Sequence, residues 1–154
     1  MNSLKYANCY IGYQEVPNEI TLCINISGCP HHCEGCHSQY LWEYEGNYIS
    51  DDIDALQDKY KGMITCICFM GGDQNLEELT ELLLKSKYLY KLKTCVYSGT
   101  DNIQIFNDIL LYLDYLKIGR FNINLGGLDK QTTNQKFYKV NNYKLEDITN
   151  IFIK

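Results

Sequence analysis

The chain has 154 residues, of which 45% are hydrophobic, and its formal net charge is −5 at pH 7. This length predicts a single globular domain over residues 1–154, large enough to fold without disulfide bonds. The acidic balance argues against a nucleic-acid partner or an anionic membrane surface, and no stretch reaches the roughly 20 apolar residues of a transmembrane helix. The first residues also lack the apolar run of a signal peptide, so we expect a cytoplasmic protein.

Apolar segments and breaker residues predict the elements in chain order. A β-rich segment, Glu19–Ser27, predicts the first strand, and Ser50–Tyr60 has apolar residues at helical spacing. The near-continuous apolar run Met63–Met70 is typical of a strand buried on both faces. The remaining segments predict a helix, a strand, a helix and a strand, in the order Asn75–Lys87, Leu92–Tyr97, Ile103–Tyr112 and Tyr115–Ile118. This alternation predicts an α/β fold with a mostly parallel sheet.

The unusual residue clusters all follow predicted strands. They lie in four loops, Gly28–Cys36, Gly71–Asp73, Ser98–Thr100 and Gly119–Phe121. Because the carboxyl ends of parallel strands meet at one edge of a sheet, we expect these loops to form a single ligand site there.

The eight cysteines fall into two groups. Five are scattered, and we expect them to pack as small apolar side chains: Cys9, Cys23, Cys66, Cys68 and Cys95. The other three, Cys29, Cys33 and Cys36, have the spacing C-x3-C-x2-C in one loop. Three thiolates at this spacing can hold an iron–sulfur cluster and leave one iron of a four-iron cluster open for chemistry.

A structural zinc ion is the alternative metal for this loop. His31, His32 or His37 would complete a Cys3His site, although zinc sites of this type usually pair two C-x2-C knuckles and the sequence has no second knuckle. The zinc hypothesis makes the chain a non-catalytic interaction module.

The order of motifs resembles the radical S-adenosylmethionine (SAM) superfamily, in which such a cysteine loop follows the first strand and Gly-Gly-Asp follows the second. Several strings are similar to the activating proteins of anaerobic (class III) ribonucleotide reductase. These strings are SGCPHHCEGCHS, MGGD, YSGT, LKIGRF and TTNQ, and they span about residues 20–140. The resemblance implies an incomplete TIM-like βα barrel, since the chain is too short for a full barrel of roughly 250 residues.

The resemblance also implies the cofactors and their residues. Cys29, Cys33 and Cys36 would hold a [4Fe–4S] cluster, to which SAM would bind. The expected SAM-binding residues are Gly35, Cys36, His37, Gly71, Gly72 and Asp73, with Ser98 and Asn134 as weaker candidates. The expected protein substrate is the large subunit of the anaerobic reductase, and a low-potential donor such as flavodoxin or ferredoxin would supply the electron.

Other interpretations of these residues stay open at this point. Gly71-Gly72 alone is an ordinary strand terminator, Asp73 would also suit a helix cap, and Asn134 a turn. Lys117 and Arg120 flank the end of the fourth predicted strand, and each is either solvated or paired with the SAM carboxylate. The alternative activities within the superfamily are those of an activase of another glycyl radical enzyme and of a small-molecule radical SAM enzyme, such as the one that makes the deazaguanine ring.

Overall fold

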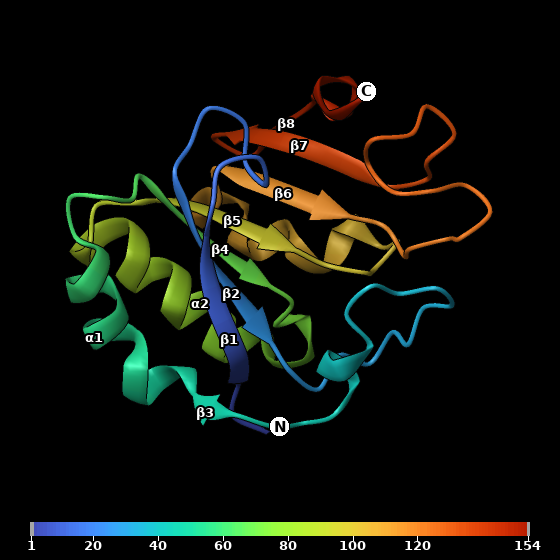
Figure 1. The fold of residues 1–154 in the computed structure, drawn as a ribbon. Coiled ribbons are helices and arrows are strands. Elements are labelled where there is room, and N and C mark those ends of the chain that lie inside the picture. The colour runs from blue at the N-terminus through green and yellow to red at the C-terminus, as the bar shows by residue number, and fades with distance from the viewer. Residues whose placement is uncertain (1, 154) are drawn as a thin grey trace.

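The computed structural model describes residues 2–153 and shows them as one eight-stranded sheet flanked by helices (Figure 1). The strands are β1 (Lys5–Gly12), β2 (Thr21–Ile26), β3 (Asn47–Tyr48), β4 (Cys66–Met70), β5 (Lys93–Tyr97), β6 (Tyr115–Ile118), β7 (Lys136–Asn141) and β8 (Lys144–Asp147). Their order across the sheet is β3-β1-β2-β4-β5-β6-β7-β8. The helices are α1 (Ile49–Tyr60) and α2 (Leu76–Leu84), the latter continued by a π-helical turn at Lys85–Leu89.

Four further segments form 3-10 turns or helices, at Gln39–Trp42, Asp73–Asn75, Ile103–Tyr112 and Thr149–Phe152. The third of these covers the range where sequence periodicity predicts an α-helix. No helix within residues 2–153 combines the length and apolar character that crossing a membrane requires.

The prediction of a TIM-like βα barrel with a mostly parallel sheet is wrong. Within the described residues only the central pairings β2–β4, β4–β5 and β5–β6 are parallel, whereas β1 and β7 each pair antiparallel with both of their neighbours. Most of the pairings are therefore antiparallel, and the sheet is open rather than a barrel.

Short connections explain this departure from the barrel. Parallel neighbours need a crossover of a dozen or more residues, but only a short loop joins β1 to β2, so these strands run antiparallel. The β7–β8 hairpin turns on Asn142 and Tyr143, whose φ values of 48° and 68° are those of a two-residue turn that matches strand twist. The outer strands therefore extend the sheet by antiparallel pairing.

The central strands place alternate side chains on opposite faces of the sheet. Ile67, Phe69 and Val96 face α1 and α2 and belong to the larger apolar core. Helices α1 and α2 lie on the same side of the sheet in Figure 1. The Leu79 and Leu83 side chains of α2 are fully buried there, as the apolar stripe of that segment predicts.

A second core covers the opposite face of the sheet. It consists of Val16, Cys23, Cys66, Cys68, Cys95, Tyr115 and Phe137. Phe137 is fully buried, with its ring centroid 4.8 Å from that of Phe152 and 6.1 Å from that of Tyr97. Cys23, Cys68 and Cys95 are direct register partners on β2, β4 and β5. Side chains from β7 and from the segments flanking the sheet therefore cover this face.

Strands β2, β4, β5 and β6 all end at the same edge of the sheet. Figure 1 shows the cysteine-rich segment after β2 and the long connection between β6 and β7 extending from this end. The parallel part of the sheet thus gathers the loops that carry the candidate site, as expected for strands with this orientation.

Candidate metal and ligand site

The cysteine loop lies directly after β2 and is fixed to the segment that follows it. Cys33 is buried, with 7% of its surface exposed, and Cys29 and Cys36 are half-buried. The Cys29 N–H donates to the Leu41 carbonyl over 2.9 Å, and the Cys36 N–H donates to the Cys33 carbonyl over 3.1 Å. Gly35 has a φ of 76°, and a Cβ there would lie 2.6 Å from Ile123, so only glycine fits.

Backbone N–H groups point at the sulfur atoms of this loop. The Ser38 N–H donates to Cys36 Sγ over 3.3 Å. Burial raises the pKa of the Cys29 thiol, and hydrogen bonds from the backbone N–H groups of His31 and His32 oppose that shift. Sulfur atoms that accept N–H bonds are typical of iron–sulfur ligands, because these bonds stabilise the thiolate.

The thiols do not surround one ion position. Among residues 2–153, no three His, Cys, Asp or Glu side chains converge as the ligands of a single metal ion. A four-iron cluster takes each thiolate on a different iron, so its three cysteines need not converge in that way. The donor set and its N–H bonds fit a cluster.

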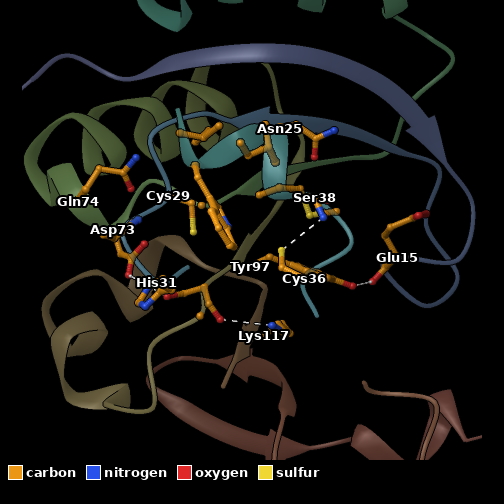
Figure 2. Close-up of a pocket in the computed structure, with 18 of the residues that line it drawn as sticks. Glu15, Asn25, Cys29, His31, Cys36, Ser38, Asp73, Gln74, Tyr97 and Lys117 are labelled. Carbon is orange, nitrogen blue, oxygen red and sulfur yellow. Dashed lines mark hydrogen bonds and ion pairs between the residues drawn. The ribbon is translucent and has the colours of Figure 1, made fainter. Parts of the chain in front are cut away.

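A cavity of about 340 Å³ lies between the cysteine loop and the ends of the central strands (Figure 2). Its lining includes five of the predicted site residues, namely Cys29, Cys36, Gly71, Asp73 and Ser98. Met70, Tyr97 and Lys117 from the ends of β4, β5 and β6 also line it. The structure therefore brings three of the four predicted loops to one cavity.

Asp73 holds together three segments around this cavity. Its Oδ2 lies 3.1 Å from His31 Nε2 and accepts a hydrogen bond from Ser98 Oγ over 3.0 Å, and Figure 2 shows Asp73 beside His31. The close approach of His31 requires Gly99, because a Cβ there would lie 2.8 Å from the imidazole ring. The interpretation of Asp73 as a helix cap is wrong, since the side chain of Asn75 caps α2.

The side chain of Gln74 holds the Gly-Gly-Asp turn in place through two hydrogen bonds. Gln74 Oε1 accepts from the Gly72 N–H, and its Nε2 donates to the Ser27 carbonyl, each over 3.1 Å. The turn also needs its glycines, because Gly71 and Gly72 have φ values of 115° and 103°. A Cβ on Gly72 would meet Leu79 and Ile26 in the apolar core at 3.1 and 3.2 Å, so Gly72 serves packing.

Lys117 brings a positive charge to the cavity. Its Nζ donates to the Gly119 carbonyl over 3.2 Å and to the Ser98 carbonyl over 3.4 Å, and it lies 5.8 Å from the centre of the Tyr97 ring. Burial lowers the pKa of Lys117 to about 8, against the opposing influence of the three loop cysteines. The cavity thus contains a carboxylate and an ammonium group.

The remaining predicted SAM-binding residues do not line this cavity. The His37 ring packs 5.6 Å from that of Phe121, and Asn134 Nδ2 donates to the Arg120 carbonyl over 3.0 Å. Asn134 lines a second, polar hollow of about 380 Å³ that also includes Glu34 and Arg120. Gly35 and Gly72 contact Ile123 and the apolar core respectively.

His31 and Gln74 also belong to the site, although no motif in the sequence predicts this. The sequence suggests His31 as one of three possible ligands of a zinc ion, whereas its ring contacts Asp73 at the edge of the cavity. Gly99, directly after Ser98, is the one local signal for the position of His31, because a glycine allows another side chain to approach closely. His31 lies on a loop that is distant in the sequence, so the contact becomes evident only in the folded structure.

Comparison with known proteins identifies the family. A family model described as a 4Fe-4S single cluster domain matches residues 20–147, which include the cysteine loop and every strand of the parallel region. Comparisons with curated proteins and with solved structures gave no match. The matched region covers most of the chain and agrees with the thiolate donor set described above. The chain belongs to the 4Fe-4S single cluster domain family.

Proposed function

We propose that this iron–sulfur protein is a radical SAM enzyme that installs a glycyl radical on the large subunit of anaerobic ribonucleotide reductase. The observation that carries the SAM proposal is the shared cavity, where Cys29 and Cys36 lie opposite the Gly71–Asp73 turn and Lys117. The choice of partner depends on the resemblance of the sequence strings to the reductase activating proteins.

The charges in the cavity suit the methionine end of SAM. That end carries an ammonium and a carboxylate group, and the cavity offers the Asp73 carboxylate and the Lys117 ammonium. His31 and Ser98 hold Asp73 in place, so its carboxylate is oriented before a ligand arrives. We assign Asp73 to the SAM ammonium and Lys117 to the SAM carboxylate.

The size of the cavity favours a protein substrate. At about 340 Å³ it lies at the lower end of the usual range for small-molecule sites, and SAM would share it with the cluster held by Cys29 and Cys36. A second small molecule would need further space, whereas a glycine in a loop of a partner would only need to reach the mouth.

The chemistry that a reduced cluster supplies is transfer of one electron to SAM, which breaks a carbon–sulfur bond to give methionine and a 5′-deoxyadenosyl radical. That radical takes a hydrogen atom from the glycine Cα, which leaves 5′-deoxyadenosine and a glycyl radical. A low-potential flavodoxin or ferredoxin would supply the electron. The protein holds SAM, orients it and keeps water from the radical.

SAM cleavage is the direct test. The anaerobically reconstituted protein should contain about four irons and four sulfides. With SAM and a strong reductant it should then release methionine and 5′-deoxyadenosine in equal amounts. A protein with a full cluster but no 5′-deoxyadenosine would instead be an electron carrier, and a protein that binds one zinc ion and no iron would be the interaction module.

The partner needs a separate test. With the large reductase subunit from the same source, electron paramagnetic resonance should show a glycyl radical doublet that grows as 5′-deoxyadenosine forms. SAM cleavage without a radical on the reductase would refute this partner and point to another glycyl radical enzyme. Consumption of a small molecule in place of a protein substrate would refute the activase assignment.

A further inference from the structure

Trp42 has a buried polar atom with no partner beside the cysteine loop. Its indole nitrogen, Nε1, is inaccessible to solvent and has no hydrogen-bond acceptor among the residues that the structure describes. The side chain also lines the cavity shared with Cys29 and Cys36. Buried N–H groups are almost always paired, so an unpaired one next to a cofactor site indicates an acceptor on the cofactor.

The backbone fixes Trp42 next to the first cysteine. The Cys29 N–H donates to the Leu41 carbonyl over 2.9 Å, and the Gly28 N–H donates to the Glu43 carbonyl over 3.1 Å. These two bonds flank Trp42 on both sides. The segment that carries the indole therefore runs alongside the start of the cysteine loop, and its position depends on the same backbone that positions Cys29.

The cysteine loop also fixes the orientation of the indole. The ring of His32 stacks on that of Trp42, with centroids 4.5 Å apart and planes 10° from parallel. His32 has a φ of 45°, in the left-handed region that non-glycine residues seldom adopt. His32, which lies between the ligand cysteines Cys29 and Cys33, thus covers one face of the indole ring. The N–H on the edge of the ring is then the polar group that still needs a hydrogen-bond acceptor.

We propose that the indole N–H of Trp42 donates a hydrogen bond to a sulfide of the iron–sulfur cluster and thereby raises its reduction potential. A donor at a cluster sulfur stabilises the more negative, reduced state. Trp42 is then a positioning and tuning residue, since it acts through the cluster. The inference rests on the cluster and is independent of SAM cleavage.

Trp42 is the single tryptophan of the chain, so tryptophan labelling addresses one site. Protein grown with ¹⁵N-indole tryptophan should show, in pulsed electron paramagnetic resonance of the reduced cluster without SAM, coupling to this nitrogen and to one exchangeable proton. Absence of both couplings in protein with a full cluster would overturn the proposal.

The reduction potential gives a second, independent readout. Replacement of tryptophan with benzothienylalanine keeps the shape of the ring and removes the N–H, and the midpoint potential without SAM should become more negative. Trp42→Phe should shift it in the same direction. Tyr40→Phe is the matched control, because Tyr40 lies on the same segment as Trp42 and its hydroxyl contacts Asn8 and Asn25. This variant should leave the potential unchanged.

An unchanged potential in the benzothienylalanine protein at full iron content would refute the proposal. If the same protein also binds SAM more weakly, the indole N–H donates to SAM and not to the cluster. Neither result would bear on whether the protein cleaves SAM.

Discussion

Replacing Asp73 separates two roles that the structure gives to its carboxylate. In the folded protein it accepts from Ser98 and contacts His31, and in the proposed complex it also faces the SAM ammonium. Asp73→Asn keeps the shape and one acceptor oxygen but removes the charge. Asp73→Ala removes both acceptor oxygens and leaves the two partners without this contact.

The expected loss of stability follows from these contacts. The Asp73 side chain is 8% exposed, so water does not readily replace it, whereas His31 is 20% exposed and recovers part of the loss. At about 1 kcal/mol for each hydrogen bond, Asp73→Ala should lower the free energy of unfolding by about 2 kcal/mol, and Asp73→Asn by about 1 kcal/mol. For a chain of this size, Asp73→Ala should lower the Tm by roughly 4–8 °C.

We expect removal of the Asp73 charge to weaken SAM binding more than it destabilises the fold. Loss of a charge-assisted contact of about 1.5–3 kcal/mol should weaken SAM binding roughly 10- to 100-fold in Asp73→Asn. Equilibrium dialysis of the reconstituted protein would measure the affinity, with iron content and thermal unfolding recorded for each variant. Ser98→Ala is the control, because it removes one hydrogen bond to the carboxylate and keeps the charge.

The comparison of these two variants decides the role of the charge. We expect Ser98→Ala to change SAM affinity by only a few-fold while it costs about 1 kcal/mol of stability. If Asp73→Asn binds SAM as tightly as the unmodified protein, the carboxylate serves only to hold His31 and Ser98. If both variants weaken SAM equally, the hydrogen-bond network and not the charge determines the affinity.

Three further outcomes follow from the structure. Cys33→Ala should lose the iron and sulfide of the cluster, whereas Cys66→Ala, in the second core, should keep them. Equal iron contents in the two variants would refute the assignment of Cys33 as a ligand. Phe137→Ala should lower the free energy of unfolding by about 3–5 kcal/mol in urea titrations, since the ring is fully buried between aromatic neighbours, and a loss below about 1 kcal/mol would contradict that packing. SAM affinity should fall as pH rises through about 8, where Lys117 loses its positive charge. Lys117→Met should bind SAM weakly at every pH, and an affinity of the unmodified protein that does not change with pH would exclude the proposed contact with the SAM carboxylate.

Sequence patterns predicted the central part of the fold well. The β6 range is as predicted, and β4, β5 and α1 differ from prediction only near their ends, because continuous apolar runs and helical spacing are strong local signals. The outer strands β1, β3, β7 and β8 were not predicted. Strands β3 and β8 are exposed throughout, β1 is mostly exposed or half-buried, and β7 buries only Phe137 and Val140. Their strand conformation therefore depends on pairing with neighbours that local sequence does not specify.

The candidate site was predictable where the ligand chemistry is local. The cysteine spacing and the Gly-Gly-Asp turn point to their loops directly, and the structure places Cys29, Cys36 and Asp73 at one cavity. The contacts of His31 and Gln74 join loops that are distant in sequence, so they could not be predicted from either loop alone. Asn134 was a weaker candidate and lines a separate hollow.

The second core has a consequence for how the protein acquires the right iron ligands. Burial raises the pKa of the thiols of Cys23, Cys66, Cys68 and Cys95, so these side chains stay protonated at neutral pH. Protonated, solvent-excluded thiols cannot compete for incoming iron, because only thiolates bind it. Of eight cysteines in the sequence, the folded chain therefore withholds half from metal capture. Folding before cluster insertion would protect the protein from mismetallation, and a chain loaded while unfolded would lack that selectivity.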